Sequence, residues 1–292
     1  MHDFIGRTAV ITGAASGLGR EFARRARSLG MRLVLADIDA SSLERLVSEL
    51  GGKPNVIGVP TDVSDALQVQ GLAARTQREF GATHLLFNNA GVGSGGYVWE
   101  HTERDWQWVL GVNLMGVVHG LQSFVPTMLE SSRAGEPAHI VNTASVAGWL
   151  SAPLMGIYNV SKHAVVTLTE TLHQDLRLAG SKIGVTLLSP AFAPTGIDQS
   201  ERNRPARWAS DAPLSASQRA AQAQSAKAIA SGRIGAAEVA RMTFDAVRAE
   251  RFYVFTHPRI FPTLSARVRH AVEGLPPADP YESRPESRPR IE

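Results

Sequence analysis

The amino-acid sequence predicts an α/β fold, in which helices cover both faces of one doubly wound parallel sheet of about seven strands. Three observations support this fold class. Short apolar, β-branched runs alternate with helix-patterned segments along the 292 residues. A glycine-rich turn, TGAASGLG at 12–19, joins the first run to the first helical segment. No later segment has the pattern of a second core, so we expect a single domain over residues 1–274.

The expected strands are short runs rich in Val, Ile and Leu. They cover residues 8–12, 32–37, 56–61, 84–88, 139–145, 184–189 and 252–256. In doubly wound sheets, ligands bind outside the carboxyl ends of the strands. The residues that follow these runs are therefore the candidates for a site.

The expected helices lie between the strands. They cover residues 18–29, 41–50, 64–80, 102–131, 158–179 and 236–250. Ser41 and Glu44 have the spacing of a capping box, and Ser64 is a candidate N-cap residue. Pro126 can kink the long helix 102–131.

Two segments interrupt the alternation. Residues 196–232, rich in Ala, Ser, Arg and Gln, form a long insertion of the kind that often serves as a lid over a substrate. Residues 275–292, LPPADPYESRPESRPRIE, are rich in proline and charge and are expected to be a disordered tail.

The composition excludes several classes of function. The net charge is only +3, which does not indicate binding to nucleic acid. The chain has no cysteine, which excludes disulfides and thiolate sites, and its nine histidines show no metal spacing. The sequence shows no secretory signal and no apolar run of the roughly 18–20 residues that a membrane span needs. We expect a cytoplasmic protein without a metal, a nucleic-acid partner or a membrane partner.

The glycine-rich turn is the first candidate site. Gly13, Gly17 and Gly19 provide the tight turn, the close backbone approach and the helix packing that a pyrophosphate requires. The N–H groups and dipole at the start of the helix favour negative charge. Three glycines alone are a weak signal, but between a strand and a helix they indicate a dinucleotide site.

An acid follows the second expected strand. Asp37 lies twenty residues after Gly17, where a carboxylate can accept hydrogen bonds from the adenosine ribose and repel a 2′-phosphate. Ser16, rather than a basic residue, precedes Gly17. Both points favour NAD over NADP. Alternatively, Asp37 caps the following turn, and Asp39 is a rival for either role. Asp62, after the third strand, can reach the adenine or is simply a solvated loop acid.

The stretch YNVSK at 158–162 places Tyr158 and Lys162 four residues apart, on one face of a helix and roughly 5–6 Å apart at Cβ. An ammonium next to a phenol can lower the pKa of the tyrosine from about 10 toward neutrality. Such a tyrosine can exchange a proton with an alcohol or a carbonyl. Alternatively, Tyr158 is half-buried in an ordinary helix and Lys162 is solvated.

Together the motifs resemble the short-chain dehydrogenase/reductase family. TGAASGLG at 12–19, NNAG at 88–91, Asn113, Ser145 and YNVSK at 158–162 occur in the order and spacing of that family over residues 5–260. The stretches VNLMGVVHGLQSFVPTML and AHIVNTASVAG are most similar to a branch that includes bacterial aryl-alcohol dehydrogenases, such as those that oxidise the benzylic alcohol of lignin-derived ethers. The family has a Rossmann-like fold.

The resemblance implies a catalytic set. Tyr158 would be the acid/base, Lys162 would tune it and bind the nicotinamide ribose, and Ser145 would orient the substrate oxygen. Asn113 would position a water in a proton relay through Lys162. Taken singly, Ser145 could satisfy backbone groups at a strand end, and Asn113 could simply kink its helix.

The resemblance also implies a set of cofactor contacts. They are Gly13, Ser16, Gly17, Leu18, Gly19, Asp37, Asp62, Val63, Asn89, Ala90, Gly91, Tyr158, Lys162, Pro190 and Thr195. Asn88 is expected to stabilise the sheet. Where the family usually has Pro-Gly, this chain has Pro190-Ala191, so the contacts on the nicotinamide side are open to question.

The candidate substrate pocket is apolar and aromatic, which suits a bulky hydrophobic ligand. Besides Ser145, it comprises Gly96, Trp149, Leu150, Met155 and Phe192. Trp149 and Met155 could instead serve core packing or a subunit contact. For the arginines of the insertion, Arg202, Arg204 and Arg207, a solvated lid face is favoured over closure on a charged group.

The sequence therefore predicts an NAD-dependent dehydrogenase of secondary alcohols. The alternatives are an NADPH-dependent carbonyl reductase and a nucleotide sensor that has lost turnover. The resemblance also implies a homodimer or homotetramer, formed through the helices 102–131 and 158–179.

Overall fold

A seven-stranded parallel sheet organises the part of the chain that the structure describes, which in this computed structural model is every residue except 210–211, 283–284, 286–287, 290 and 292. The strand order is β3-β2-β1-β4-β5-β6-β7. The strands are β1 Thr8–Thr12, β2 Arg32–Asp37, β3 Val56–Pro60, β4 Leu85–Asn88, β5 His139–Thr143, β6 Gly184–Ser189 and β7 Tyr253–Phe255. The predicted fold class is confirmed.

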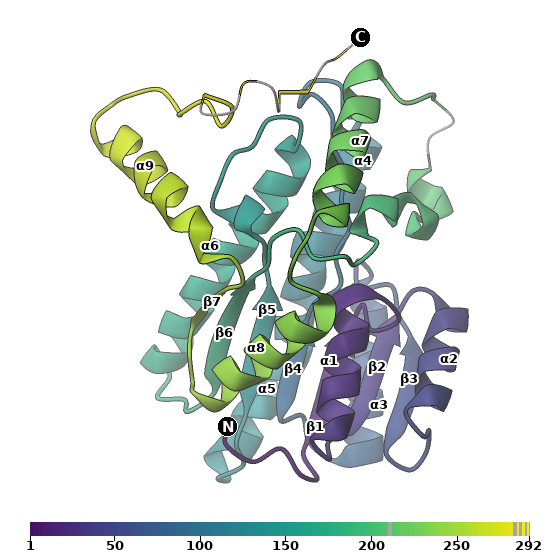
Figure 1. The fold of residues 1–292 in the computed structure, drawn as a ribbon. Coiled ribbons are helices and arrows are strands. Elements are labelled where there is room, and N and C mark those ends of the chain that lie inside the picture. Colours follow the sequence, from purple (N-terminus) through teal and green to yellow (C-terminus); the bar gives the residue numbers. More distant parts are fainter. Residues whose placement is uncertain (210–211, 283–284, 286–287, 290, 292) are drawn as a thin grey trace.

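Helices cover both faces of the sheet (Figure 1). They are α1 Gly17–Ser28, α2 Ala40–Glu49, α3 Ala66–Phe80, α4 Glu103–Leu110, α5 Gly116–Arg133, α6 Gly156–Leu178, α7 Ala216–Ala230, α8 Ala236–Arg248 and α9 Phe261–Val272. One core packs α1, α2 and α8 on the sheet, with Phe22 stacked on Phe87 at 4.7 Å. The other packs α3, α5 and α6, with Phe124 and Leu176 buried. Because both faces of the sheet are covered, its strands are continuous apolar runs.

Two predicted helix caps are wrong. The N-cap of α2 is Asp39, whose carboxylate accepts from the backbone N–H of Ser42 at 3.0 Å, so Ser41 and Glu44 form no capping box. The N-cap of α3 is Asp65 rather than Ser64, whose hydroxyl donates to Asp62. In both places a carboxylate is available one or two residues from the expected serine, and its charge complements the dipole at the helix start.

The helix expected over 102–131 is divided. Thr102 and Asp105 form a capping box at the start of α4, and a π-helical segment, Gly111–Met115, separates α4 from α5. Single π-turns in a long helix often occur at functional sites. This one carries Asn113 and turns it into the protein interior, where it is fully buried. Pro126 lies inside α5.

The stretch Glu103–Arg133 is also, by length and composition, apolar enough to cross a membrane, which the sequence analysis did not expect. Its most apolar window has a mean hydropathy of 1.3 and is 44% buried inside the protein. The buried part includes Phe124 and Met128, which belong to the core beneath the sheet. A helix of a globular core passes the same test.

The insertion 196–232 is largely helical. It contains 3₁₀ turns at Ile197–Asn203 and Ala206–Trp208, and then α7. The sequence of α7 has almost no apolar face, so only its capping box, Ser215 with Gln218, could have indicated it. The disorder expected for 275–292 stays a prediction, and part of that tail lies outside the described residues. Within it, the Tyr281 hydroxyl accepts a hydrogen bond from Gln224 of α7 at 3.0 Å.

Candidate active site

The candidate catalytic residues meet where β5 ends. Ser145 lies two residues beyond this strand, and α6 brings Tyr158 and Lys162 to the same place. The Lys162 ammonium donates to the carbonyl oxygen of Thr143, the last residue of β5, at 2.9 Å. It also lies 5.8 Å from the centre of the Tyr158 ring. The side chain of Lys162, from α6, is thus fixed at the end of β5.

Burial controls the charges here. It raises the pKa of Tyr158 above its usual value, while a hydrogen bond with Ser145 acts in the opposite direction and is the weaker effect. Burial also lowers the pKa of Lys162 to about 8. The expected lowering of the tyrosine pKa is therefore not found in this structure. Loss of hydration penalises the phenolate more than the groups around it stabilise it.

Asn113 is fixed by three hydrogen bonds. Its side-chain oxygen accepts from the backbone N–H of Val92 at 2.8 Å. Its side-chain nitrogen donates to the carbonyl oxygen of Val92 at 2.9 Å and to the Ser161 hydroxyl at 3.0 Å. These bonds tie the π-helical segment to the turn after β4 and to α6. Both the oxygen of Asn113 and the ammonium of Lys162 lie close to Gly91, where an added Cβ would be 3.4 Å and 3.3 Å from them.

Ser145 lies in an extended conformation and caps a short 3₁₀ turn, Val146–Gly148. Its hydroxyl accepts from the backbone N–H of Ala147 at 3.2 Å and makes a long bond of 3.3 Å to the carbonyl oxygen of Pro190. The backbone after β6 is itself fixed, since Ala191 N–H donates to the Thr256 hydroxyl at 3.1 Å. The segments after β5 and β6 are therefore joined by a hydrogen bond. The backbone at Ala191 is held in place although this position has alanine where the family usually has glycine.

The glycine-rich turn leaves no room for side chains. Gly13 and Gly17 have φ values of +64° and +50°. A Cβ on Gly13 would lie 2.8 Å from the Cα of Ala90, and one on Gly17 would lie 2.9 Å from the Cβ of Thr195. On Gly19 it would lie 2.0 Å from the carbonyl oxygen of Gly13. The absence of side chains brings Ala90 and Thr195 close to the turn, and the approach of these glycines to a pyrophosphate stays a prediction.

Ser16 and Leu18 lie at the start of α1. Ser16 is the N-cap residue but makes no side-chain cap bond, and Leu18 is buried. The N–H groups of this helix start thus face the turn without a protein carboxylate in the first turn of the helix. Such a helix start fits an anionic group, and the three glycines fit the close approach of a pyrophosphate.

Asp37 is buried at the end of β2, and its two carboxylate oxygens accept from the backbone N–H groups of Ala15 at 2.8 Å and Asp39 at 3.0 Å. Burial raises its pKa. The rival Asp39 is occupied by the cap of α2, and its hydrogen bonds with Ser42 lower its pKa to about 2. Asp37 therefore holds the turn through Ala15 and Asp39, and its contact with a ribose stays a prediction.

A polar cavity of about 220 Å³ lies beside Asp37. It is lined by Ala15, Ser16, Arg20, Asp37, Asp39, Ser42, Gly196, Gln199, Arg202 and Asn203. Four of these residues come from the insertion and had not been predicted to belong to the cofactor side. They carry no family motif, so nothing in the sequence pattern could have singled them out.

Asp62 is not a solvated acid. It is buried, accepts from Ser64 and forms an ion pair with Arg207 at 2.6 Å. The neighbouring Val63 is buried against α5, and its carbonyl oxygen lies 2.9 Å from the ring nitrogen Nδ1 of His119. The position after β3 is thus rigid.

The turn NNAG joins the ends of β1 and β4. The Thr12 hydroxyl accepts from the backbone N–H groups of Asn89 at 2.9 Å and Ala90 at 3.1 Å. The Asn89 side chain donates to the carbonyl oxygen of Thr12 at 2.9 Å. Asn88 instead donates to Asn142 of β5 at 2.9 Å, as its expected role in the sheet requires. The sequence pattern does not single out Thr12, because one threonine at a strand end is not a distinctive signal.

The candidate substrate residues differ in their contacts and in their exposure. Gly96 forms a bridge with Met155, and Gly95 would clash with Leu154 and α7 if it carried a side chain. Trp149 points to the edge of the sheet, where its indole N–H donates to Ser189 at 2.9 Å and its ring packs on Phe255.

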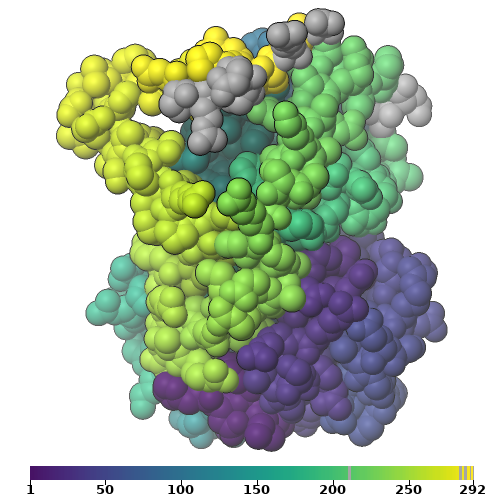
Figure 2. All heavy atoms as spheres, viewed as in Figure 1, coloured from purple at the N-terminus to yellow at the C-terminus, as the bar shows by residue number. Residues whose placement is uncertain are grey.

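Leu150 is half-buried, and Phe192 is 53% exposed. Figure 2 shows a hollow between α7 and α9, with teal residues of the middle of the chain on its floor.

The solvated lid face expected for the arginines is wrong for Arg204. Arg204 is 9% exposed and pairs with Asp105 at 2.6 Å, and its guanidinium carbon lies 4.8 Å from the centre of the Trp108 ring. Arg207 pairs with Asp62. Arg202, which donates to the carbonyl oxygens of Gly196 and Gln199, keeps an exposed position, and the Arg207 side chain is 50% exposed.

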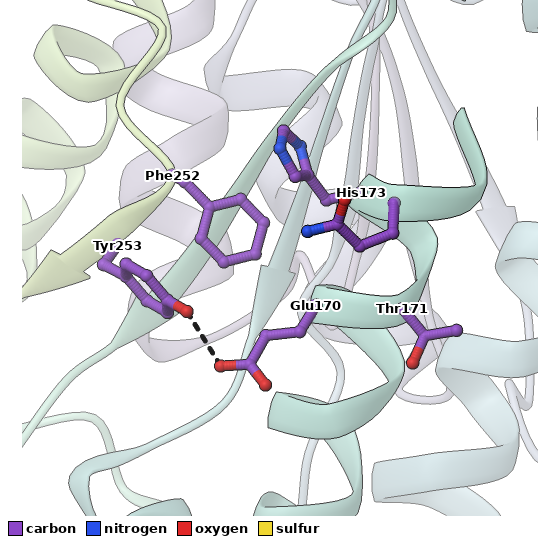
Figure 3. Close-up of a pocket in the computed structure, with 6 residues that line it drawn as sticks. Glu170, Thr171, His173, Phe252 and Tyr253 are labelled. Carbon is purple, nitrogen blue, oxygen red and sulfur yellow. Dashed lines mark hydrogen bonds between the residues drawn. The ribbon is translucent and has the colours of Figure 1, made fainter. Parts of the chain in front are cut away.

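A larger recess, of about 520 Å³, lies elsewhere (Figure 3). It is lined by Glu170, Thr171, His173, Gln174, Phe252 and Tyr253. Tyr253 points toward Glu170 of α6 and donates to it at 2.9 Å. None of the candidate catalytic residues lines this recess. Among the residues that the structure describes, no group of three His, Cys, Asp or Glu side chains could hold a metal ion.

Comparisons with known proteins show which family the chain resembles. The family model for short chain dehydrogenases matches residues 7–206. A C alpha-dehydrogenase of Sphingobium sp. strain SYK-6 is 32% identical, covering 100% of this chain and 93% of the relative. A CLA biosynthesis dehydrogenase/reductase of Lactiplantibacillus plantarum is 33% identical, covering 94% of this chain and 97% of the relative.

Among solved structures, a short chain dehydrogenase/reductase from Burkholderia phymatum in complex with NAD is 54% identical. It superposes with a TM-score of 0.93, covering 96% of this chain and 99% of that one. The match of the family model to most of the chain, together with full-length relatives above 30% identity, identifies the protein as an oxidoreductase of the short-chain dehydrogenase/reductase family.

Proposed function

We propose that the protein transfers a hydride between a bulky, hydrophobic secondary alcohol and NAD, with Tyr158, Ser145 and Lys162 as its catalytic set. The observation that carries the proposal is the meeting of these three residues at the end of β5, beside Gly91 and the glycine-rich turn. A non-catalytic sensor would have no need of this set.

The residues present fit a nicotinamide dinucleotide. Gly13, Gly17 and Gly19 have no side chain that would separate the turn from a pyrophosphate, the first turn of α1 has no acidic residue, and Asp37 would accept from the ribose. When bound, the nicotinamide accepts the hydride that leaves the alcohol carbon. Asn89, Ala90 and Gly91 would border the cofactor on the side of β4, and Thr195 and Pro190 would border it on the side of β6.

The side chains of the protein must remove the hydroxyl proton of the alcohol. In the oxidation direction, the Tyr158 oxygen accepts the hydroxyl proton as negative charge develops on the substrate oxygen. Ser145 donates a hydrogen bond to that oxygen and stabilises the charge. The ammonium of Lys162 favours the phenolate form of Tyr158, and Asn113 holds the turn that carries Gly91 against Lys162. Reduction of a ketone runs through the same residues in reverse.

The substrate class rests on the pocket lining and on one relative. Gly96, Met155, Leu150 and Phe192 would supply an apolar wall next to Ser145, and Trp149 would border it from the edge of the sheet. The Sphingobium relative is named a C alpha-dehydrogenase, which supports an aryl alcohol oxidised at its benzylic carbon. We therefore propose an aromatic secondary alcohol as the first substrate to test.

One observation favours a second candidate, an NADPH-dependent carbonyl reductase. Arg20 and Arg202 line the cavity beside Asp37, and a guanidinium is a good partner for a 2′-phosphate. The carboxylate of Asp37 would repel a 2′-phosphate and therefore disfavours this second candidate. NAD in the complex of the Burkholderia protein supports the first candidate.

Initial rates test both candidates. Aliphatic, alicyclic and aryl secondary alcohols are offered with NAD and with NADP, and the matching ketones with NADH and NADPH. We expect the highest kcat/KM for an aryl alcohol with NAD. Absence of turnover with every pair, despite nucleotide binding, would contradict the proposal and favour the sensor.

We also propose a homodimer or homotetramer built through α5 and α6. Val160 of α6 is 48% exposed, Met115 directly before α5 is 40% exposed, and residues of α6 within 170–174 line the recess of Figure 3. Light scattering after size exclusion measures the mass directly, and a 31.4 kDa species at micromolar concentration would refute this assembly.

A further inference from the structure

The segment Ile197–Trp208, here named the cover segment, is attached to the cofactor side of the sheet at three places. Near its start, the Ser200 hydroxyl accepts from the backbone N–H of Gly93, after β4, at 2.8 Å. In its middle, Arg204 pairs with Asp105 of α4 at 2.6 Å. Near its end, Arg207 donates to Asp62 at 2.6 Å and to Ser64 at 2.8 Å, after β3. The segment therefore extends from β4 to β3 across the ends of the strands between them.

This path crosses the place where the adenosine half of a dinucleotide would lie. Asp37 ends β2 and Asp62 follows β3, and these strands are parallel neighbours in which Asp37 pairs with Pro60. Both carboxylates thus lie at the same edge of the sheet. The cover segment supplies Gln199, Arg202 and Asn203 to the cavity beside Asp37, and Arg207 to Asp62. In Figure 1 this part of the chain lies above α1 and β2.

The two ion pairs differ in strength. Both partners of the Arg204–Asp105 pair are 9% exposed, and the guanidinium also lies over Trp108, so this contact is buried and fixed. In the Arg207–Asp62 pair the arginine is 50% exposed. Its partner Asp62 is 9% exposed, so only the arginine side of this pair is open to water, and such a pair is more sensitive to salt than a fully buried one. Of the two ion pairs, Arg207–Asp62 is therefore the one that opens more easily, and Arg204 is the fixed point.

We propose that the cover segment is part of the cofactor site: Gln199, Arg202 and Asn203 contact the adenosine half, and the Arg207–Asp62 pair holds the segment over it. The cofactor then leaves when this pair opens. The inference rests on the proposed binding of NAD, and it assigns to the insertion a role at the adenosine end rather than only over the substrate.

Release of NADH, measured by stopped-flow fluorescence in the absence of substrate, tests the ion pair. Arg207→Gln removes the charge and keeps most of the side-chain length. We expect the release rate to rise roughly two- to fivefold, the range that an exposed ion pair can supply. The rate for the wild-type protein should rise with added NaCl, and this dependence should be smaller in the variant.

Arg241→Gln is the matched control, because Arg241 also forms exposed ion pairs, with Glu238 and Asp245, but on α8 and away from the cover segment. Its release rate should equal that of the wild type. An unchanged release rate and an unchanged salt dependence in Arg207→Gln would overturn the role of the pair.

Fragments of the cofactor test the contacts. Asn203→Ala should weaken inhibition by 5′-AMP about two- to tenfold, as expected for loss of a hydrogen bond, and leave the affinity for reduced nicotinamide mononucleotide unchanged. Equal affinity of Asn203→Ala and wild type for 5′-AMP would overturn the proposed contact of the cover segment with the adenosine half. Failure of the wild-type protein to bind NADH at all would refute the proposed function itself, and is thus distinct from either of these results.

Discussion

The ammonium of Lys162 donates to the carbonyl oxygen of Thr143 at 2.9 Å and lies 5.8 Å from the centre of the Tyr158 ring. One contact fixes the position of the charge, and the other sets its distance from the phenol. Because Thr143 ends β5 and Ser145 follows it, the same strand end positions the lysine and the serine. The geometry of the proposed catalytic set is therefore determined by the end of β5.

The first prediction concerns the proton transfer. Tyr158→Phe removes the hydroxyl and keeps the ring, so the fold and NADH binding should be retained. We expect kcat to fall about 10²- to 10⁴-fold, the usual contribution of a general acid or base. Steady-state rates with the best alcohol measure the loss, and NADH titration of the same preparation is the control. Turnover near that of the wild type would show that another group moves the proton.

The second prediction concerns the pH dependence of stability. The pKa of Lys162 in the folded protein is lowered to about 8, against an ordinary value of 10.5, because its ammonium is buried. Below pH 8 the lysine is charged in both states, and the folded state bears the cost of desolvation. Between these two pKa values the folded state loses the proton first, so this group makes the wild type more stable as the pH rises.

Lys162→Met should therefore change its stability relative to wild type with pH. We expect the free energy of unfolding of the variant, relative to that of the wild type, to fall by roughly 1–3 kcal/mol between pH 7.5 and 10.5. Urea unfolding of both proteins across this range measures the difference, with Lys182→Met at an exposed position as the matched control. A gap between Lys162→Met and wild type that stays constant would refute the assignment.

The third prediction compares two helical glycines. In Gly19→Ala the new Cβ would lie 2.0 Å from the carbonyl oxygen of Gly13, so the glycine-rich turn must move. We expect a loss of NADH affinity of at least about tenfold and a lower Tm. Gly71→Ala, in α3, is the control: nothing lies within 4 Å of its Cβ, and helix propensity should stabilise the protein by about 0.5–1 kcal/mol. Equal NADH affinity in the two variants would contradict the close packing at Gly19.

Local chemistry determined what the sequence could predict. The strands were predictable because parallel strands are continuous apolar runs, and the set of Ser145, Tyr158 and Lys162 because the family motifs fix its spacing. The caps of α2 and α3 were misplaced because Asp39 and Asp65 compete with serines close by.

Other features depend on tertiary structure. α7 was missed because its alanines and glutamines form no apolar stripe, and its place is set by contacts such as that of Ser217 with Tyr97, at 2.8 Å. The burial of Arg204 was unpredictable, since its partner Asp105 lies 99 residues earlier. The raised pKa of Tyr158 likewise depends on burial, which a helical spacing of four residues does not reveal.

The last prediction concerns the choice between NAD and NADP. Asp37 lines the cavity beside the glycine-rich turn together with Arg20 and Arg202. With the carboxylate present, a 2′-phosphate meets repulsion, and with it removed the two guanidinium groups are free to attract one. Asp37→Ala should weaken NAD and improve NADP relative to it, changing the ratio of the two kcat/KM values by about 10- to 100-fold, the scale of hydrogen bonds to a charged group.

The control is Asp39→Ala. Asp39 also borders the cavity, but its carboxylate caps α2, so this variant should lose stability by about 1 kcal/mol with little change in the ratio. Asp37→Ala also removes the acceptor for the N–H of Ala15, so its Tm must be measured beside its kinetics. Because a general loss of stability lowers both kcat/KM values alike, only a change in their ratio identifies Asp37 as the selector. An unchanged ratio in a folded Asp37→Ala variant would transfer that role to the arginines of the cavity.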